Sequence, residues 1–209
     1  MGREGLRYVT PEVTLTFHPS MTRMRLHNLE SGRGDPMLTA MRLQPGDRVL
    51  DCTLGLGVDA VVAASIVGSK GAVDGLEVVL PIFLVVADGL ATYEAPNQRL
   101  TEAMRRVRAH WAEASAFLAS VTPGVYEVIY IDPFFEKPVA ASSSIAPVRA
   151  LGAHDWVPLR RAAEKATEIA RRCVVVKGNR GSAFFRDLPV AEVVAGRHSS
   201  IEYAVLSAR

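Results

Sequence analysis

The run Asp132-Pro133-Phe134-Phe135 contains the groups needed to present an amino group to a methyl donor. An exocyclic amine of a nucleic-acid base is a poor nucleophile because its lone pair is delocalised into the ring. The carboxylate of Asp132 and the carbonyl of Pro133 can each accept a hydrogen bond from such an amine and turn its lone pair toward the donor. An aromatic ring at Phe135, or at Phe134, can stack on a base taken out of its helix. We therefore predict a catalytic site here, against the alternative of a simple turn whose phenylalanines fill the core.

A second candidate site is the glycine turn Asp51-Cys-Thr-Leu-Gly-Leu-Gly-Val-Asp59, which joins the end of a strand to the start of a helix. Gly55 and Gly57 allow the backbone to pass close to a ligand, and amides at the helix start can point at it. With Glu77 about 20 residues farther on, the turn also matches a loose dinucleotide fingerprint, and Glu77 can bind ribose hydroxyls in either case. Asp51 favours S-adenosylmethionine, because an acid there can receive the ammonium of that cofactor but would repel a pyrophosphate. We predict this cofactor, with an NAD-dependent oxidoreductase on a Rossmann fold as the alternative.

Other residues that could carry chemistry show no such pattern. The chain has no Gly-Lys-Ser/Thr sequence, so a phosphate-binding P-loop is excluded. Its histidines lack metal-ligand spacing, and we predict no metal site. Cys52 and Cys173 lie in apolar segments and are expected to be reduced packing residues. Lys177 follows a buried strand, and we expect its side chain to reach solvent rather than to contact a substrate phosphate.

The elements that position these groups alternate between strands and helices from Asp47 onward. Strands are predicted at 48–51, 72–77, 107–111, 126–131, 173–177, 190–195 and 201–207. Helices are predicted at 59–67, 81–93, 97–108 and 156–172, with a Ser- and Ala-rich loop at 136–155. A short strand near 13–17 and a helical stretch at 36–43 precede them.

This alternation predicts an α/β fold with a doubly wound, mostly parallel sheet of seven strands and helices on both faces. Ligands of such sheets bind beyond the carboxyl ends of the strands. Four acidic residues fall at or just beyond predicted strand ends, namely Asp51, Glu77, Glu113 and Asp132. The two candidate sites are therefore expected to meet at one edge of the sheet.

The composition is typical of one globular domain. The 209 residues are 49% hydrophobic and 22% charged. We expect an extension at 1–45, packed on a cofactor-binding domain at 46–209. The longest apolar run, 78–87, is too short to cross a bilayer, and the first residues lack the apolar segment of a secretory signal. A cytoplasmic protein without membrane contact is therefore predicted.

Arginines gather in several groups, although the net charge is only +2. Such groups could form a surface that contacts phosphates, but solvated helix faces are the preferred interpretation. The members are Arg23, Arg25, Arg99, Arg105, Arg106, Arg108, Arg160, Arg161, Arg171 and Arg172.

Several of these segments resemble known enzymes. Asp132-Pro-Phe-Phe resembles motif IV, Asp/Asn-Pro-Pro-Tyr/Phe, of amino-group methyltransferases, with Phe134 in place of the second proline. The glycine turn, Asp88-Gly-Leu, Tyr130-Ile-Asp-Pro-Phe-Phe-Glu-Lys and Val174-Val-Val-Lys look, in this order, like the bacterial small-subunit ribosomal RNA guanine-N2 methyltransferases of the J type. The likeness covers about residues 48–178 and implies the Rossmann-like fold of class I methyltransferases.

The resemblance implies an enzyme that methylates guanine N2 of small-subunit ribosomal RNA, so RNA or a ribosomal subunit is the expected partner. A methyltransferase acting on another substrate and a binding module without chemistry are the alternatives. Glu113 is placed either to accept the adenine amino group of the cofactor or to begin a helix. The glycine turn and the resemblance together predict a cofactor site of Asp51, Thr53, Gly55, Leu56, Gly57, Val58, Asp59, Glu77, Val78, Glu113, Ala114 and Asp132.

Overall fold

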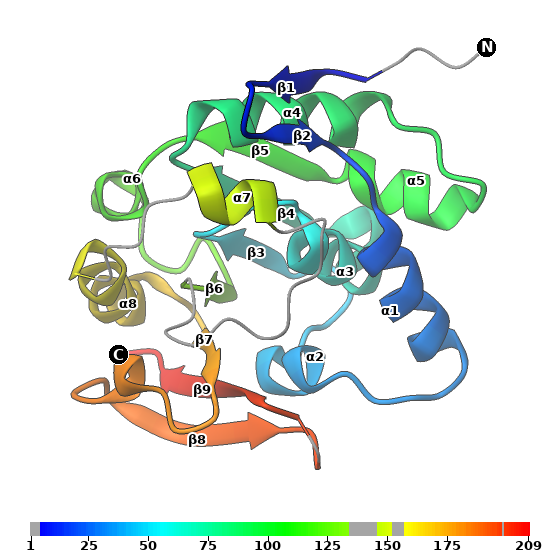
Figure 1. The fold of residues 1–209 in the computed structure, drawn as a ribbon. Coiled ribbons are helices and arrows are strands. Elements are labelled where there is room, and N and C mark those ends of the chain that lie inside the picture. Colours follow the sequence, from blue (N-terminus) through cyan, green and yellow to red (C-terminus); the bar gives the residue numbers. More distant parts are fainter. Residues whose placement is uncertain (1–4, 134–145, 152–156, 198) are drawn as a thin grey trace.

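The computed structural model describes residues 5–133, 146–151, 157–197 and 199–209. Within these ranges one seven-stranded sheet runs through the molecule between two layers of helices (Figure 1). The first five strands in its spatial order are parallel, β9 is antiparallel to β7, and β8 is antiparallel to β9. That order is β5 (Val107–Trp111), β4 (Ala72–Glu77), β3 (Arg48–Asp51), β6 (Val128–Ile131), β7 (Cys173–Asn179), β9 (Ile201–Ser207) and β8 (Val190–Ala195). The predicted doubly wound α/β class is confirmed.

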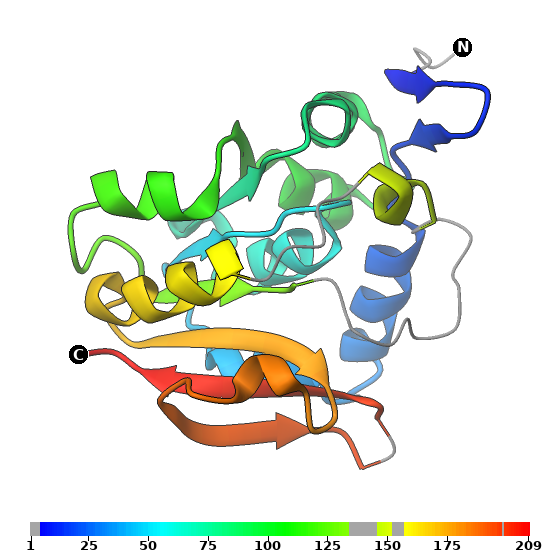
Figure 2. The ribbon, with the colours of Figure 1, turned by 60° about the vertical axis from the view of Figure 1, so that its left-hand side comes forward.

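Side chains alternate between the two faces of the sheet, so Val49 and Leu50 of β3 enter different apolar clusters. One face is covered by α6 (Ala114–Ser120) and α8 (Val157–Ile169). The other is covered by α2 (Pro36–Met41), α3 (Val58–Val67), α4 (Leu80–Thr92) and α5 (Gln98–Arg105). Figure 2 shows the two helical layers on opposite sides of the sheet, with β8 at its outer edge. No helix in the described ranges is long and apolar enough to cross a membrane.

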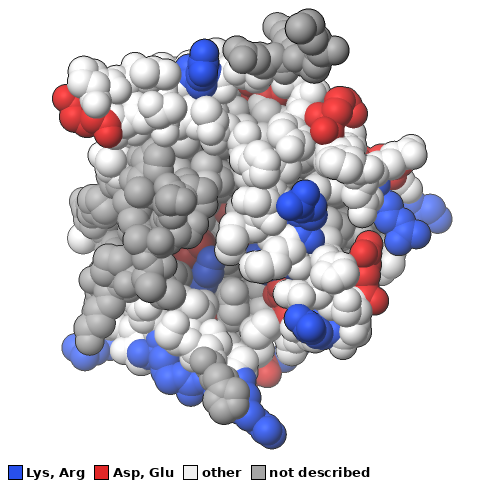
Figure 3. Space-filling model, turned by 45° about the vertical axis from the view of Figure 1, so that its right-hand side comes forward, with Lys and Arg blue, Asp and Glu red and all other residues white. Residues whose placement is uncertain are grey.

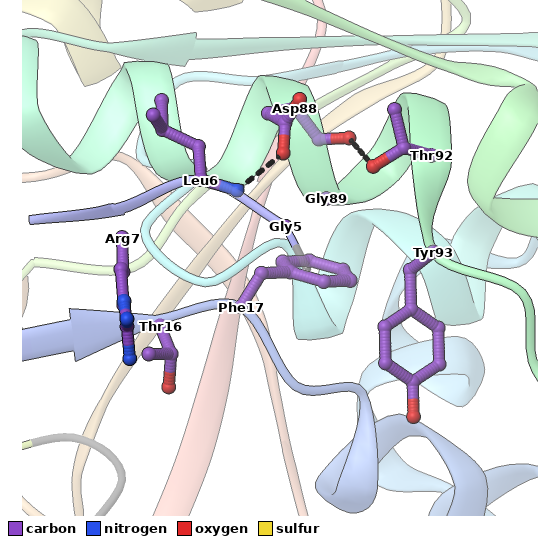
Figure 4. Close-up of a pocket in the computed structure, with 9 residues that line it drawn as sticks. All are labelled: Gly5, Leu6, Arg7, Thr16, Phe17, Asp88, Gly89, Thr92 and Tyr93. Carbon is purple, nitrogen blue, oxygen red and sulfur yellow. Dashed lines mark hydrogen bonds between the residues drawn. The ribbon is translucent and has the colours of Figure 1, made fainter. Parts of the chain in front are cut away.

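The N-terminal residues form a two-stranded hairpin, β1 (Arg7–Val9) and β2 (Thr14–Thr16), that packs on α4 (Figure 4). The N–H of Leu6 donates a hydrogen bond to Oδ2 of Asp88 at 2.7 Å. Gly89 gives the room for this packing, because a Cβ atom there would lie 2.1 Å from the ring of Phe17. The hairpin is therefore held on α4 by the hydrogen bond to Asp88 and by close packing at Gly89.

Most predicted elements are confirmed with small changes at their ends. The strands at 48–51, 72–77, 107–111, 190–195 and 201–207 have the predicted bounds, whereas 126–131 begins at Val128 and 173–177 continues to Asn179. The predicted helices are present and end within three residues of the predicted positions. Two 3-10 turns occupy Gly68–Lys70 and Ala183–Phe185.

Four short or polar elements escaped prediction: β1, α1 (Ser20–Glu30), α6 and α7 (Ala146–Leu151). In α1 only Thr22 is buried, so the helix has no apolar stripe to reveal it. The loop predicted at 136–155 is wrong over α7, a helix of six residues that is too short for a periodic pattern. Val148 of α7 is buried in the same cluster as Leu15 of β2. Residues 136–145 and 152–155 lie outside the described residues.

Candidate active site

The two predicted sites meet at the carboxyl edge of the sheet. β3 and β6 are parallel neighbours, so the chain leaves both strands side by side. The N–H of Cys52 donates to the carbonyl of Tyr130 at 2.8 Å, and the N–H of Asp132 donates to the hydroxyl of Thr53 at 2.7 Å. The glycine turn and the aspartyl-prolyl segment are thus joined by hydrogen bonds, at the edge that the sequence predicted.

The carboxylate of Asp51 is buried at the end of β3, with 2% of the residue exposed. It accepts hydrogen bonds from the N–H and the hydroxyl of Thr53 at 2.9 and 3.3 Å. Burial raises the pKa of Asp51 to about 8, and the neighbouring carboxylates of Asp59 and Asp132 contribute to the rise. An opposite charge brought to this carboxylate would therefore be strongly favourable.

Glu77 ends β4, the strand beside β3, and is also buried. Its two oxygens accept the N–H groups of Gly55 at 3.1 Å and Val79 at 2.8 Å. Burial raises the pKa of Glu77, and these hydrogen bonds oppose the rise. Gly55 and Gly57 have φ angles of 50° and 74°, in the left-handed region that favours glycine. The glycine turn therefore depends on both glycines and is anchored to Glu77.

Asp59 lies in the first turn of α3, where three side chains bind it. The guanidinium of Arg25, from α1, pairs with Oδ1. The hydroxyl of Tyr130 donates to Oδ2 at 2.7 Å, and Nζ of Lys177 lies 3.1 Å from the same oxygen. Burial would raise the pKa of Asp59, but Lys177 and Arg25 outweigh it and hold this pKa well below its usual range. Asp59 is therefore an anion inside an ion-pair network.

The expectation that Lys177 reaches solvent is wrong. Its side chain is 18% exposed, and Nζ lies 2.7 Å from Oδ2 of Asp132 as well as close to Asp59. The cause is the register between neighbouring strands: Ile131 of β6 pairs with Val176 of β7, so the residues that follow them stand side by side. Burial would lower the pKa of Lys177, but the two carboxylates raise it above its usual value.

Asp132 carries the predicted catalytic carboxylate, and its side chain is 26% exposed. Burial raises its pKa; Lys177 opposes the rise and Asp59 adds to it. Pro133 is buried directly after it. Phe134 and Phe135, the predicted stacking residues, lie outside the described residues.

Glu113 begins α6, just beyond the end of β5. Its two carboxylate oxygens accept the N–H groups of Ser115 at 2.9 Å and Ala116 at 2.8 Å. The helix-cap interpretation of Glu113 is therefore confirmed. Nearby, the indole N–H of Trp111 donates to the carbonyl of Val78 at 3.0 Å, and the Val78 residue is about half exposed.

Comparison with known proteins gives the family of the chain. The family model described as "Putative SAM-dependent methyltransferase" matches residues 8–201. The chain belongs to this family. As a SAM-dependent methyltransferase it uses S-adenosylmethionine, which decides between the two predicted cofactors.

The chain is also similar to individual proteins. The chain is 35% identical to the uncharacterized protein YpiP of Bacillus subtilis, over 85% of this chain and 69% of YpiP. It is 30% identical to the ribosomal RNA small subunit methyltransferase J of Laribacter hongkongensis, over 87% of this chain but only 65% of that protein. Among solved structures, a SAM-dependent methyltransferase of Neisseria gonorrhoeae shares the fold with a TM-score of 0.66, at 18% identity over 97% of this chain and 78% of the other.

The buried acids of the methyltransferase fit its cofactor. Within the described residues, neither Asp51 nor Glu77 forms an ion pair with a basic side chain. A ligand ammonium matches the unpaired charge of Asp51, and ribose hydroxyls match the acceptor oxygens of Glu77. In the described part of the chain, no group of three His, Cys, Asp or Glu side chains could hold a metal ion.

Most of the arginines in the predicted groups form ion pairs with carboxylates. The preferred interpretation of solvated helix faces is wrong for Arg25, whose side chain is 17% exposed, and for Arg108, which lies on β5. On the face drawn in Figure 3, basic side chains stand apart across the surface, with a group along the lower rim. The paired arginines include Arg25, Arg105, Arg106, Arg108, Arg160, Arg171 and Arg172.

Proposed function

We propose that this methyltransferase acts on an exocyclic base amine of RNA, namely guanine N2 of small-subunit ribosomal RNA. The observation that carries the proposal is the place of Asp132, which is followed by Pro133 and joined to the glycine turn at the carboxyl edge of the sheet. Two relatives named as ribosomal RNA small subunit methyltransferases support the choice of RNA. The chain spans about two thirds of their length, so their substrate is part of the proposal.

In this proposal, residues at the ends of β3, β4 and β5 would hold the cofactor. Asp51 would bind its ammonium, Glu77 would bind the ribose hydroxyls, and Glu113 would accept the adenine amino group in addition to capping α6. The remaining predicted cofactor residues lie in the glycine turn, at the start of α3, directly after β4, at the start of α6 and, for Asp132, directly after β6. When bound, S-adenosylmethionine supplies an electrophilic methyl group on its sulfonium.

The residues after β6 then prepare the acceptor. The carboxylate of Asp132 and the carbonyl of Pro133 accept the hydrogens of the base amine, which turns the nitrogen lone pair toward the methyl carbon. The bound cofactor would supply the methyl group to this nitrogen and would keep the electron pair of the C–S bond on sulfur, and the extra proton on nitrogen would leave to solvent. Phe135, or Phe134, would stack on the extruded base.

Asp132→Ala tests this role. Alanine removes both acceptor oxygens, so the base amine loses one of its two hydrogen-bond partners at the site. We expect transfer of labelled methyl groups to ribosomal RNA from a strain lacking the gene to fall by about 100-fold or more. Nucleoside mass spectrometry of the wild-type product should show N2-methylguanosine.

Asp187→Asn is the matched control, because Asp187 is exposed and asparagine tolerates its positive φ. The control should transfer methyl groups at the wild-type rate. Full activity of Asp132→Ala would reject the catalytic role. A methylated product other than RNA would instead favour the alternative of a methyltransferase with another substrate.

A further inference from the structure

Four charged side chains form a continuous chain from the N-terminal helix to the proposed acceptor site. Arg25 of α1 pairs with Asp59 of α3, and Asp59 pairs with Lys177 of β7 at 3.1 Å. Lys177 in turn pairs with Asp132 at 2.7 Å. At the other end, Arg25 lies 2.8 Å from Asp35 at the start of α2. Acidic and basic side chains therefore alternate along this network, from the start of α2 to the residue after β6.

This arrangement is built into the fold rather than into flexible surface side chains. Each of the four side chains is at most 26% exposed. The β6–β7 register brings Lys177 to Asp132, and the start of α3 brings Asp59 to the same edge of the sheet. Tyr130 adds a hydrogen bond to Asp59 at 2.7 Å. Such packing leaves the ammonium of Lys177 little freedom to leave its two carboxylates.

Lys177 is placed to orient the carboxylate of Asp132. Nζ bonds Oδ2 of Asp132, so it fixes the rotation of the carboxylate and directs an incoming amine to Oδ1. The bond also supplies a positive charge where the carboxylates of Asp51, Asp59 and Asp132 crowd together. A neutral, protonated Asp132 would present a donor to the amine and would hold it less well.

We propose that Lys177 is a positioning residue for methyl transfer: it orients Asp132 and keeps it an anion, while Asp59 and Arg25 hold Lys177 in place. This inference rests on the proposed function, because it gives Asp132 the acceptor-binding role. An ion pair that served only to stabilise the fold would affect unfolding, but neither the turnover number nor its dependence on pH.

The pH dependence of this site has several contributors. Within the described residues, charged or titratable groups on several neighbouring elements act on Asp132 and Lys177. The pH profile of a variant must therefore be compared with that of the wild type. These groups are Asp51 on β3, Asp59 on α3, Tyr130 on β6, Lys177 on β7, Tyr203 on β9 and Arg25 on α1.

Lys177→Met removes the charge and retains most of the length of the side chain. We expect kcat at saturating RNA and cofactor to fall by about 10- to 100-fold, with the affinity for S-adenosylhomocysteine almost unchanged. The acid limb of the kcat profile should move toward higher pH by about one unit or more, because Asp132 loses its cation. Lys177→Arg should recover part of kcat. Lys165→Met, at an exposed lysine on α8, is the matched control.

A second readout does not depend on activity. Carbon-13 NMR of the Asp132 carboxyl should show a titration midpoint about one pH unit or more higher in Lys177→Met than in the wild type. If Lys177→Met does not fold, Arg25→Gln should show the same direction with a smaller change. Equal midpoints, or an unchanged kcat profile, would overturn the inference. A clear difference in midpoints without any RNA methylation by the wild type would count against the proposed function alone.

Discussion

Asp51, which is buried, and Asp132, which is partly exposed, lie at the same sheet edge in different surroundings, and we infer different roles for them. Asp132 pairs with Lys177, whereas Asp51 has only the N–H and hydroxyl of Thr53 as partners within the described residues. A carboxylate that already has a cation is suited to accept hydrogen bonds from a neutral amine. A carboxylate without a basic side chain beside it, such as that of Asp51, is suited to bind a positively charged ligand.

The difference predicts how cofactor binding depends on pH. Burial raises the pKa of Asp51 to about 8, so below that pH the free protein carries a proton there. An ammonium favours the ionised form, so binding must release this proton and becomes weaker as the pH falls. We expect the affinity for S-adenosylhomocysteine to rise from pH 6 to pH 8, by up to about tenfold per pH unit.

Calorimetry across this range, in buffers of different ionisation enthalpy, would measure both the affinity and the released proton. Asp51→Asn should bind more weakly, and its affinity should change little with pH. Asp187→Asn should behave like the wild type. A variant at Asp51 with the wild-type slope would contradict the assignment of the ammonium to this residue.

The sequence shows which residue types stand at strand ends, but not how their side chains pair. Asp51, Glu77 and Asp132 follow apolar strands, and parallel strands must end at a common edge, so their proximity was predictable. The contact between Lys177 and Asp132 depends on the register of β6 against β7, which a single sequence does not reveal. Arg25 reaches Asp59 only because α1 packs beside α3, and α1 has no apolar pattern.

At the scale of the elements, Glu113 at the start of α6 has two roles in our proposal: it caps the helix, and it binds the adenine amino group of the cofactor. Glu113→Ala should lower the free energy of unfolding by about 1 kcal/mol, because two helix N–H groups lose their acceptor. Glu113→Ser can still cap the helix but cannot reach as far, so it should recover the stability and not the cofactor affinity. Chemical denaturation and calorimetry on both variants separate the tasks. Wild-type affinity in Glu113→Ser would show that Glu113 is only a cap.

At the scale of the whole molecule, we propose that residues 1–45 are an extension of one domain at 46–209 rather than a separate unit. The hairpin packs on α4 through Phe17 and Gly89, and Arg25 joins the ion pairs of the active site. The parallel sheet itself was predictable, because continuous apolar strands alternate with helices along the chain. An extension packed on the domain was predicted, but its individual contacts were not, because they are made with elements distant in sequence.

The proposed active site requires one spatial arrangement: S-adenosylmethionine would bind across the ends of β3 and β4, with its reactive end toward Asp132. A crystal structure of the complex with S-adenosylhomocysteine tests it most directly. We expect the ligand ammonium within hydrogen-bonding distance of Asp51, the ribose hydroxyls on Glu77, and the sulfur facing the carboxylate of Asp132. A ligand bound at another edge of the sheet, or one with its sulfur directed away from Asp132, would contradict the account.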